Sequence, residues 1–413
     1  MFRGIARLAA VLLLTPLAAF AQNFDAVDTL FPSSAGQFLA YPTEPILPYE
    51  LWAQFGMDYD TNILRQPTND NHELLSRASV GGRWDGRIAG RQGLHVAGRL
   101  DGYLYHRFSE LDNVGYSALG EWRWELGNSL AGAAGASSRR WQASLSEIQR
   151  AAYDPITENR LYANGRWAIG PHLGLRGGVD FVDYNRPERQ PAELKTAGAT
   201  AGIDWITNLG NMVGLEVRHT QGDAPVNQQL DPTGQFVNND FSQTDVALVT
   251  TWFVSPNIRF AGNVGRTHRT YTDLTDREFN GPIWRAAVHW TPLAKAYLDF
   301  ETSKTVSSII DVGATHVVVR TISFGPGWAL TAKTNLSARF IHQKLDYAGD
   351  PSAAAGTTGL RSDEVRTFRL GLYWEYTRHV HVTTAWDHGT RESNEIGRDF
   401  RYNAYMANIR YIF

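Results

Sequence analysis

The last thirteen residues read Arg401-Tyr402-Asn403-Ala404-Tyr405-Met406-Ala407-Asn408-Ile409-Arg410-Tyr411-Ile412-Phe413. Counting back from Phe413, every second residue is apolar or aromatic, whereas Arg410 and Asn408 lie between them. Such alternation is typical of a β-strand whose two faces meet different surroundings. It predicts the closing strand of an outer-membrane β-barrel, with Phe413 as the signal read by the barrel-assembly machinery. An ordinary half-buried strand is the alternative that the rest of the chain has to exclude.

The N-terminus has the pattern of a secretory signal peptide. Arg3 and Arg7 precede an apolar run that ends at Phe20, and Ala19-Phe20-Ala21 is a small-x-small cleavage site. The apolar run is too short to span a bilayer as a helix. We therefore expect residues 1–21 to be removed on export, so that the mature chain begins in the periplasm of a Gram-negative cell.

Composition favours one large architecture over several soluble domains. The 413 residues include 13 Trp and no Cys, and no composition break divides them. Without cysteine the fold cannot depend on disulfides, and thiolate metal sites are excluded. The net charge of −3 gives no indication of a nucleic-acid partner. We predict a loosely ordered periplasmic segment over residues 22–49 and a barrel in contact with outer-membrane lipid over residues 50–413.

Connections between the alternating segments fall into two classes. Short turns are predicted at Ala89–Gln92, Gly127–Ser129, Ile169–His172, Thr207–Asn211, Val254–Asn257, Thr291–Ala294, Gly325–Thr331 and Thr377–His379. Long polar links are predicted at Thr61–His72, Arg107–Asn113, Ser144–Thr157, Asn185–Leu194, Gly222–Asn239, Thr272–Asn280, Ser308–Ala314, Tyr347–Asp363 and Thr390–Asp399. Short turns on one side and long loops on the other are typical of an all-β, antiparallel, up-and-down transmembrane barrel. We predict about 18 strands.

Aromatic residues recur just before the short turns. They are Trp84, Trp124, Trp167, Trp205, Trp252, Trp290, Trp374 and, in the last strand, Tyr411. A ring of amphipathic aromatics at one strand end predicts a membrane girdle. The hairpin period of roughly 40 residues also resembles that of a β-propeller, but a propeller blade packs four short strands into such a span, where this chain has two long ones.

The residues that alternate with the apolar set are expected to face the lumen. The candidates for a substrate path are Arg99, Asp101, Tyr103, Arg123, Arg166, Arg176, Asp180, Arg218, Arg259, Asp299, Arg339, Arg369, Tyr373 and Arg410. Barrels of 16–18 strands leave an aqueous channel, so these charges can be hydrated or paired. They either hold anionic or hydroxyl-rich solutes or form cross-strand ion pairs that brace the wall. Tyr105 is a further inward aromatic on which a sugar could slide.

Catalytic and metal signals are weak. His379 and His381 share a face, but no third ligand lies near them in the sequence, so two polar lumen residues are the simpler interpretation. No cofactor or metal is expected. A membrane-embedded hydrolase remains an alternative, whose sign would be an inward or rim Ser–His or Asp–His pair.

The chain resembles the exopolysaccharide-biosynthesis outer-membrane barrels of the EpsL/VpsM type, which are grouped with the β-barrel porins. The resemblance is carried by Asp58-Tyr59-Asp60-Thr61-Asn62-Ile63-Leu64-Arg65, Tyr116–Leu126, Glu158-Asn159-Arg160 leading into Arg176–Arg186, and Gly214–Asp223. It covers nearly the whole mature chain with short motifs. It implies passive secretion of a polysaccharide, fed by a periplasmic polysaccharide-export protein. A general or solute-specific diffusion porin is the alternative.

Overall fold

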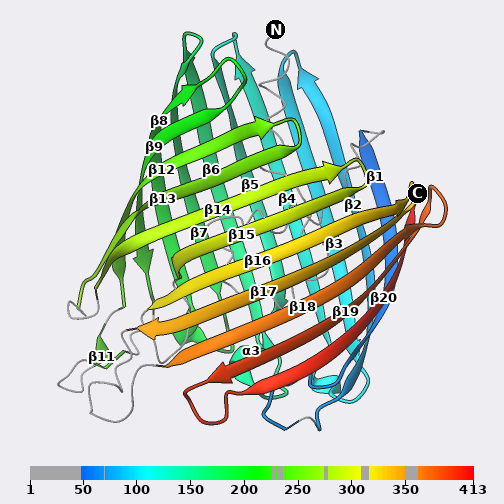
Figure 1. Ribbon diagram of the computed structural model, residues 1–413. Helices are drawn as coiled ribbons and strands as arrows, with labels where there is room; N and C mark the ends of the chain where they lie inside the picture. The colour runs from blue at the N-terminus through cyan, green and yellow to red at the C-terminus, as the bar shows by residue number, and fades with distance from the viewer. Residues whose placement is uncertain are drawn as a thin grey trace.

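The computed structural model of the chain describes residues 48–68, 70–225, 229–230, 236–237, 239–273, 278–307, 316–348 and 361–413. The predicted signal peptide and nearly all of the predicted periplasmic segment lie outside these residues. Eighteen strands form one antiparallel sheet, and Figure 1 shows them as a tilted barrel. They are β1 (Tyr49–Asp60), β2 (Glu73–Ala89), β3 (Gln92–Tyr105), β4 (Asn113–Leu126), β5 (Leu130–Gln142), β6 (Pro155–Ile169), β7 (Leu173–Asn185), β8 (Leu194–Ile206), β9 (Met212–Asp223), β12 (Phe241–Ser255), β13 (Ile258–Tyr271), β14 (Phe279–Leu293), β15 (Ala296–Ser307), β16 (His316–Thr331), β17 (Thr334–Ala348), β18 (Ser362–Glu375), β19 (Val380–Ser393) and β20 (Phe400–Ile412).

The first and last strands close the sheet. β1 pairs with β2 on one edge and with β20 on the other, with Trp52 opposite Ile412. The backbone N–H of Phe413 also donates to the carbonyl of Leu51 at 2.9 Å. β1 and β20, the blue and red strands of Figure 1, therefore lie side by side. The predictions of a closing C-terminal strand and of an 18-strand barrel are both confirmed.

The connections follow the predicted two classes. Two-residue to five-residue turns join β2 to β3, β4 to β5 and their equivalents, whereas long links leave the other end. The long links carry the short helix α3 (Leu145–Ile148), the 3-10 turns η4 (Ser109–Leu111) and η5 (Gln190–Ala192), and a small hairpin of β10 (Gln229–Leu230) and β11 (Phe236–Val237). Figure 1 shows α3 and β11 at the same end of the barrel.

The prediction of a short turn over Gly325–Thr331 is wrong. β16 continues through this stretch to Thr331, which pairs with Thr334 on β17. A Cβ on Gly327 would lie 2.1 Å from Cζ of Tyr297, so this glycine makes room for a ring. The β16–β17 ladder skips Gly325 and Pro326, as expected where proline has no N–H to donate. The Gly-Pro-Gly sequence thus marks close packing inside a strand.

The two faces of the wall differ as the alternation requires. Large apolar side chains such as Leu161, Phe181 and Leu215 are half-exposed or more on the outer face. None of the described helices is long and apolar enough to cross a membrane.

The inner face carries apolar clusters at the long-loop end. One cluster joins Val182, Tyr184, Leu194, Phe241 and Tyr271, and a second joins Val317, Val319, Leu345 and Tyr347. These apolar clusters lie beside buried charged side chains at the same end, such as Arg269 and Asp363.

Candidate functional site

The structure places all fourteen predicted lumen residues on the inner face. In β3 the exposed Val96, Leu100 and Leu104 mark the outer face, and Arg99 and Asp101 alternate with them. In each of the other strands that carry a candidate, the candidate likewise alternates with the exposed apolar residues of its own strand. The inner face of the wall is the candidate site.

Most of these charges are joined in cross-strand or same-strand ion pairs. The Arg99–Asp101 pair is 2.5 Å apart and the Arg218–Asp180 pair is 2.8 Å apart. The other ion pairs are Arg123–Glu121 at 2.6 Å, Arg176–Glu216 at 3.2 Å, Arg176–Asp204 at 3.4 Å, Arg166–Asp204 at 3.8 Å and Arg369–Asp387, and Asp299 is hydrogen-bonded to His289 Nδ1 at 2.7 Å. Opposite charges across strands stabilise a sheet, so these pairs fit the bracing alternative.

Three candidate arginines have other surroundings. Arg259 forms no ion pair with any carboxylate in the described part of the chain, and the Phe253 ring centroid lies 5.8 Å from its Cζ. Arg339 donates to Ser323 Oγ at 3.3 Å. Arg410 donates to Gln54 Oε1 at 2.9 Å. The contacts named here are therefore to neutral oxygens for Arg339 and Arg410 and to a ring for Arg259.

Two groups of candidates come together in space. Asp299, Arg339 and Arg369 line a recess of about 20 Å³ beside the Tyr297 ring. Across the closing pair of strands β1 and β20, Trp52 on β1 lies near two arginines. The Cζ of Arg410 is 4.4 Å from its ring centroid, and the Cζ of Arg99 is 5.5 Å from it.

Trp52 is a site residue that sequence reasoning missed. In β1 the exposed Tyr49, Leu51 and Phe55 are odd-numbered, so Trp52 has the parity of the polar residues. That parity was the available signal. A tryptophan on the inner face can offer a flat surface to a sugar or to a cation.

The segment between β5 and β6 crosses the barrel mouth. Ser146 accepts a hydrogen bond from Arg391 Nη1 at 2.9 Å, and the carbonyl of Glu147 accepts one from Arg398 Nη1 at 3.2 Å. Going round the sheet from β5, β19 is the sixth strand, after β4, β3, β2, β1 and β20. Arg391 faces inward and its side chain is 4% exposed. Because the inward side chain of Arg391 contacts Ser146 from a strand six positions away around the sheet, residues 143–154 lie inside the barrel wall.

Ion pairs, a hydrogen bond and an apolar contact hold this segment in place. Arg186, just past β7, pairs with Asp154 at 2.7 Å and with Glu147 at 3.4 Å. Gln149 Nε2 donates to the carbonyl of Arg65 at 2.7 Å, in the link between β1 and β2. Leu145 joins the buried cluster of Leu64, Leu75, Tyr105 and Leu111. The sequence predicted a long loop here and gave no sign that it folds inward.

Arg65, whose carbonyl accepts the hydrogen bond from Gln149, is itself held by an ion pair. Burial opposes its charge, but the Asp60 carboxylate 2.7 Å away outweighs that cost, so the pKa of Arg65 lies above its usual value.

The predicted aromatic surfaces are only partly available. Tyr105 is 4% exposed and packs in the cluster around Leu111, so its ring is not offered to a solute. Tyr103 packs against the same cluster. Tyr373 meets His381 edge-on, with ring centroids 5.5 Å apart.

The histidines form no metal site in the described residues, where no group of three His, Cys, Asp or Glu side chains comes together. His379 Nδ1 lies 2.8 Å from the carbonyl of Ile412. The rim pair that a hydrolase would need has a partial counterpart, because Ser76 Oγ lies 2.9 Å from His106 Nε2. No described side chain orients the other ring nitrogen of His106.

The predicted girdle residues lie on the outer face near the short turns. Trp84, Trp167, Trp205, Trp290, Trp374 and Tyr411 are exposed, whereas Trp124 and Trp252 are half-buried on the same face. The half-burial of Trp124 has a local cause, since its ring covers Gly132. Their anchoring role and the signal role of Phe413 stay predictions.

Comparisons with known proteins agree with this architecture. Residues 258–413 match the family described as "Putative beta-barrel porin 2". The chain has a porin-like β-barrel fold. The barrel superposes on Pseudomonas aeruginosa OccK2 (OpdF) with a TM-score of 0.51 at 10% identity, over 88% of this chain and 98% of that one. The structure of Pseudomonas aeruginosa OccK2 in complex with glucuronate superposes with a TM-score of 0.50 at 11% sequence identity, over 89% of this chain and 97% of that one. These similarities show the fold alone, and no curated protein matches the sequence.

Proposed function

We propose that the barrel is a passive diffusion channel for small hydroxylated anions and has no enzymatic activity. The observation that carries this proposal is the segment of residues 143–154, which crosses the lumen at the long-loop end. An 18-strand wall is wide enough for an aqueous channel, and a segment that folds inward narrows that channel.

The inner-face chemistry supports an anion preference. Arg259 has no carboxylate partner among the described residues, so its guanidinium is available to a solute anion. Guanidinium groups bind carboxylates through two parallel hydrogen bonds. Several weak sites in series allow a solute to enter and leave, whereas one tight site would trap it. OccK2, whose fold this barrel shares, has been crystallised with glucuronate.

Exopolysaccharide export, fed by a periplasmic partner, is the function that the sequence resemblance implied. The fold is compatible with it, but a polymer would have to pass the segment latched by Arg186 and Arg391. Among the described residues, the hydrolase alternative has in its favour the rim pair Ser76–His106 and two inward Asp–His pairs, His289–Asp299 and His95–Asp85. Small-solute diffusion needs no displaced segment and no catalytic group.

Liposome swelling tests the proposal. The purified barrel is reconstituted and challenged with sodium glucuronate, glucose and a dextran too large for general porins. We expect fast swelling with glucuronate, slower swelling with glucose and none with dextran. Passage of dextran at a rate comparable to that of glucose would support polymer export and reject the proposal.

A further inference from the structure

Three cations lie side by side on the outer face, near the long-loop end. Lys304 on β15 is directly opposite Arg320 on β16, and Arg320 is directly opposite Lys344 on β17. All three share the parity of the exposed Phe300, Phe324 and Phe340 on their own strands, so they point toward lipid.

The row holds more positive charge than its surroundings neutralise. Asp346 lies 2.7 Å from Arg320 and 3.8 Å from Lys344. Lys304 has its Nζ 5.6 Å from the Trp284 ring centroid. In the described part of the wall, Asp346 is the carboxylate that pairs with this row, whereas Glu364, directly opposite Lys344 on β18, is bound by His342 and Arg366. Like charges directly opposite each other on adjacent strands destabilise a sheet, so the row has a cost that a bound anion would offset.

Apolar side chains continue the same face toward the membrane centre. Two positions along from the row lies Ile322, and four positions along lie Phe300, Phe324 and Phe340, each more than 40% exposed. Cations at the level of the headgroups with aromatic and aliphatic side chains beneath them match the layering of a phosphorylated lipid.

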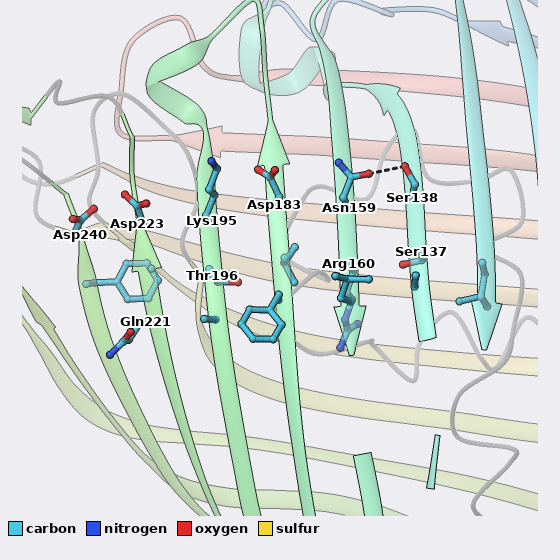
Figure 2. Close-up of a pocket in the computed structure, with 18 of the residues that line it drawn as sticks. Ser137, Ser138, Asn159, Arg160, Asp183, Lys195, Thr196, Gln221, Asp223 and Asp240 are labelled. Carbon is cyan, nitrogen blue, oxygen red and sulfur yellow. Dashed lines mark hydrogen bonds between the residues drawn. The ribbon is translucent and has the colours of Figure 1, made fainter. Parts of the chain in front are cut away.

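The opposite side of the barrel provides an internal contrast. There Lys195 on β8 is flanked by Asp183 on β7 and Asp223 on β9. Figure 2 shows this row, with Asp240 beside it, along the hollow of about 1300 Å³ that these residues border. Three acids surround one lysine in this row, so it has no excess of positive charge.

We propose that Lys304, Arg320 and Lys344 bind the phosphates of a diphosphorylated glycolipid in the outer leaflet, with its acyl chains against Phe300, Phe324 and Phe340. Long loops mark the extracellular end of such barrels, so the row faces the outer leaflet. Neighbouring strands are about 4.8 Å apart, so the two outer cations are about 10 Å apart. That span exceeds one phosphate and suits a headgroup with two. The site is independent of the solute path.

Lipid binding to the detergent-purified barrel tests the site. The probes are diphosphorylated lipid A, its dephosphorylated form and phosphatidylglycerol, and native mass spectrometry gives the bound fraction. We expect lipid A to bind more tightly than either of the others. Each cation near an anionic surface contributes about fivefold in affinity, so Lys304→Gln with Arg320→Gln and Lys344→Gln is expected to weaken lipid A binding about 100-fold.

Matched variants keep the outcome interpretable. Lys195→Gln removes a lysine from the acidic row and should leave lipid A binding unchanged, and Lys304→Arg with Lys344→Arg should retain it. Heat-modifiable gel mobility checks that each variant is folded. If the triple variant is misfolded, each single glutamine variant is measured instead, with about fivefold weakening expected. Equal binding by folded wild-type and glutamine variants, or equal binding of dephosphorylated lipid A or phosphatidylglycerol, would overturn the assignment.

Discussion

Asp154 Oδ2 lies 2.7 Å from Arg186 Nη2, and both side chains are almost fully buried, at 3% and 2% exposure. The pair joins the segment between β5 and β6 to the end of β7, inside the wall. A buried ion pair is strongly destabilising to break from one side, because the remaining charge has neither water nor a partner.

Arg186→Ala is expected to release the mouth segment. Loss of the Arg186 guanidinium leaves Asp154 and Glu147 with only the longer contacts to Arg189 Nη1, at 3.7 Å each, so the local stability of this segment should fall by up to about 3–5 kcal/mol. Single-channel conductance should rise, and protease cleavage within residues 143–154 should appear. Arg91→Ala, at an exposed short turn, is the control and should change neither. Unaltered conductance and protection in the folded Arg186→Ala barrel would show that the segment does not limit flow.

Two inner arginines should separate selectivity from stability. Arg259→Ala removes a cation with no described carboxylate partner, so the anion-to-cation permeability ratio should fall severalfold with little change in the melting temperature. Arg369→Ala should instead lower the melting temperature, because the fully buried carboxylate of Asp387 would lose its cation. Reversal potentials in a salt gradient and thermal melts of the two variants give the comparison. A stable Arg369→Ala barrel would mean that the ion pairs do not brace the wall.

Gly327 should prove sensitive to a single added methyl group. A Cβ there would meet the Tyr297 ring at 2.1 Å, so Gly327→Ala is expected to cost about 1–3 kcal/mol in unfolding free energy. Tyr297→Ala in the same chain should recover most of that loss. Gly120→Ala, where nothing lies within 4 Å, serves as the control. Additive effects in the Gly327–Tyr297 cycle would argue against the contact.

A charge on the outer face should be costly only within the membrane. Leu215→Arg, in the apolar band of β9, is expected to destabilise the barrel by about 2–4 kcal/mol. Leu209→Arg, in the adjacent short turn where the leucine is 81% exposed, should have little effect. Urea unfolding in lipid vesicles measures both. Similar costs at the two positions would contradict the assigned membrane boundary.

The strand number, the closure and the two faces could be predicted because alternation is a local property of the sequence. The Gly325-Pro326-Gly327 stretch was misread for a related reason, since glycine and proline mark both turns and close packing. The ion-pair register could not be predicted, because partners such as Arg218 and Asp180 depend on strand pairing. The Arg391–Ser146 contact, between residues 245 positions apart, follows from closure of the whole barrel.

The most direct test of the account is the permeability of the reconstituted barrel to glucuronate in a liposome-swelling assay, with empty liposomes as the baseline. A passive channel for small hydroxylated anions predicts saturable, energy-independent swelling that is faster for glucuronate than for glucose. A folded barrel that admits neither solute, or that admits a large dextran as readily as glucose, would contradict it.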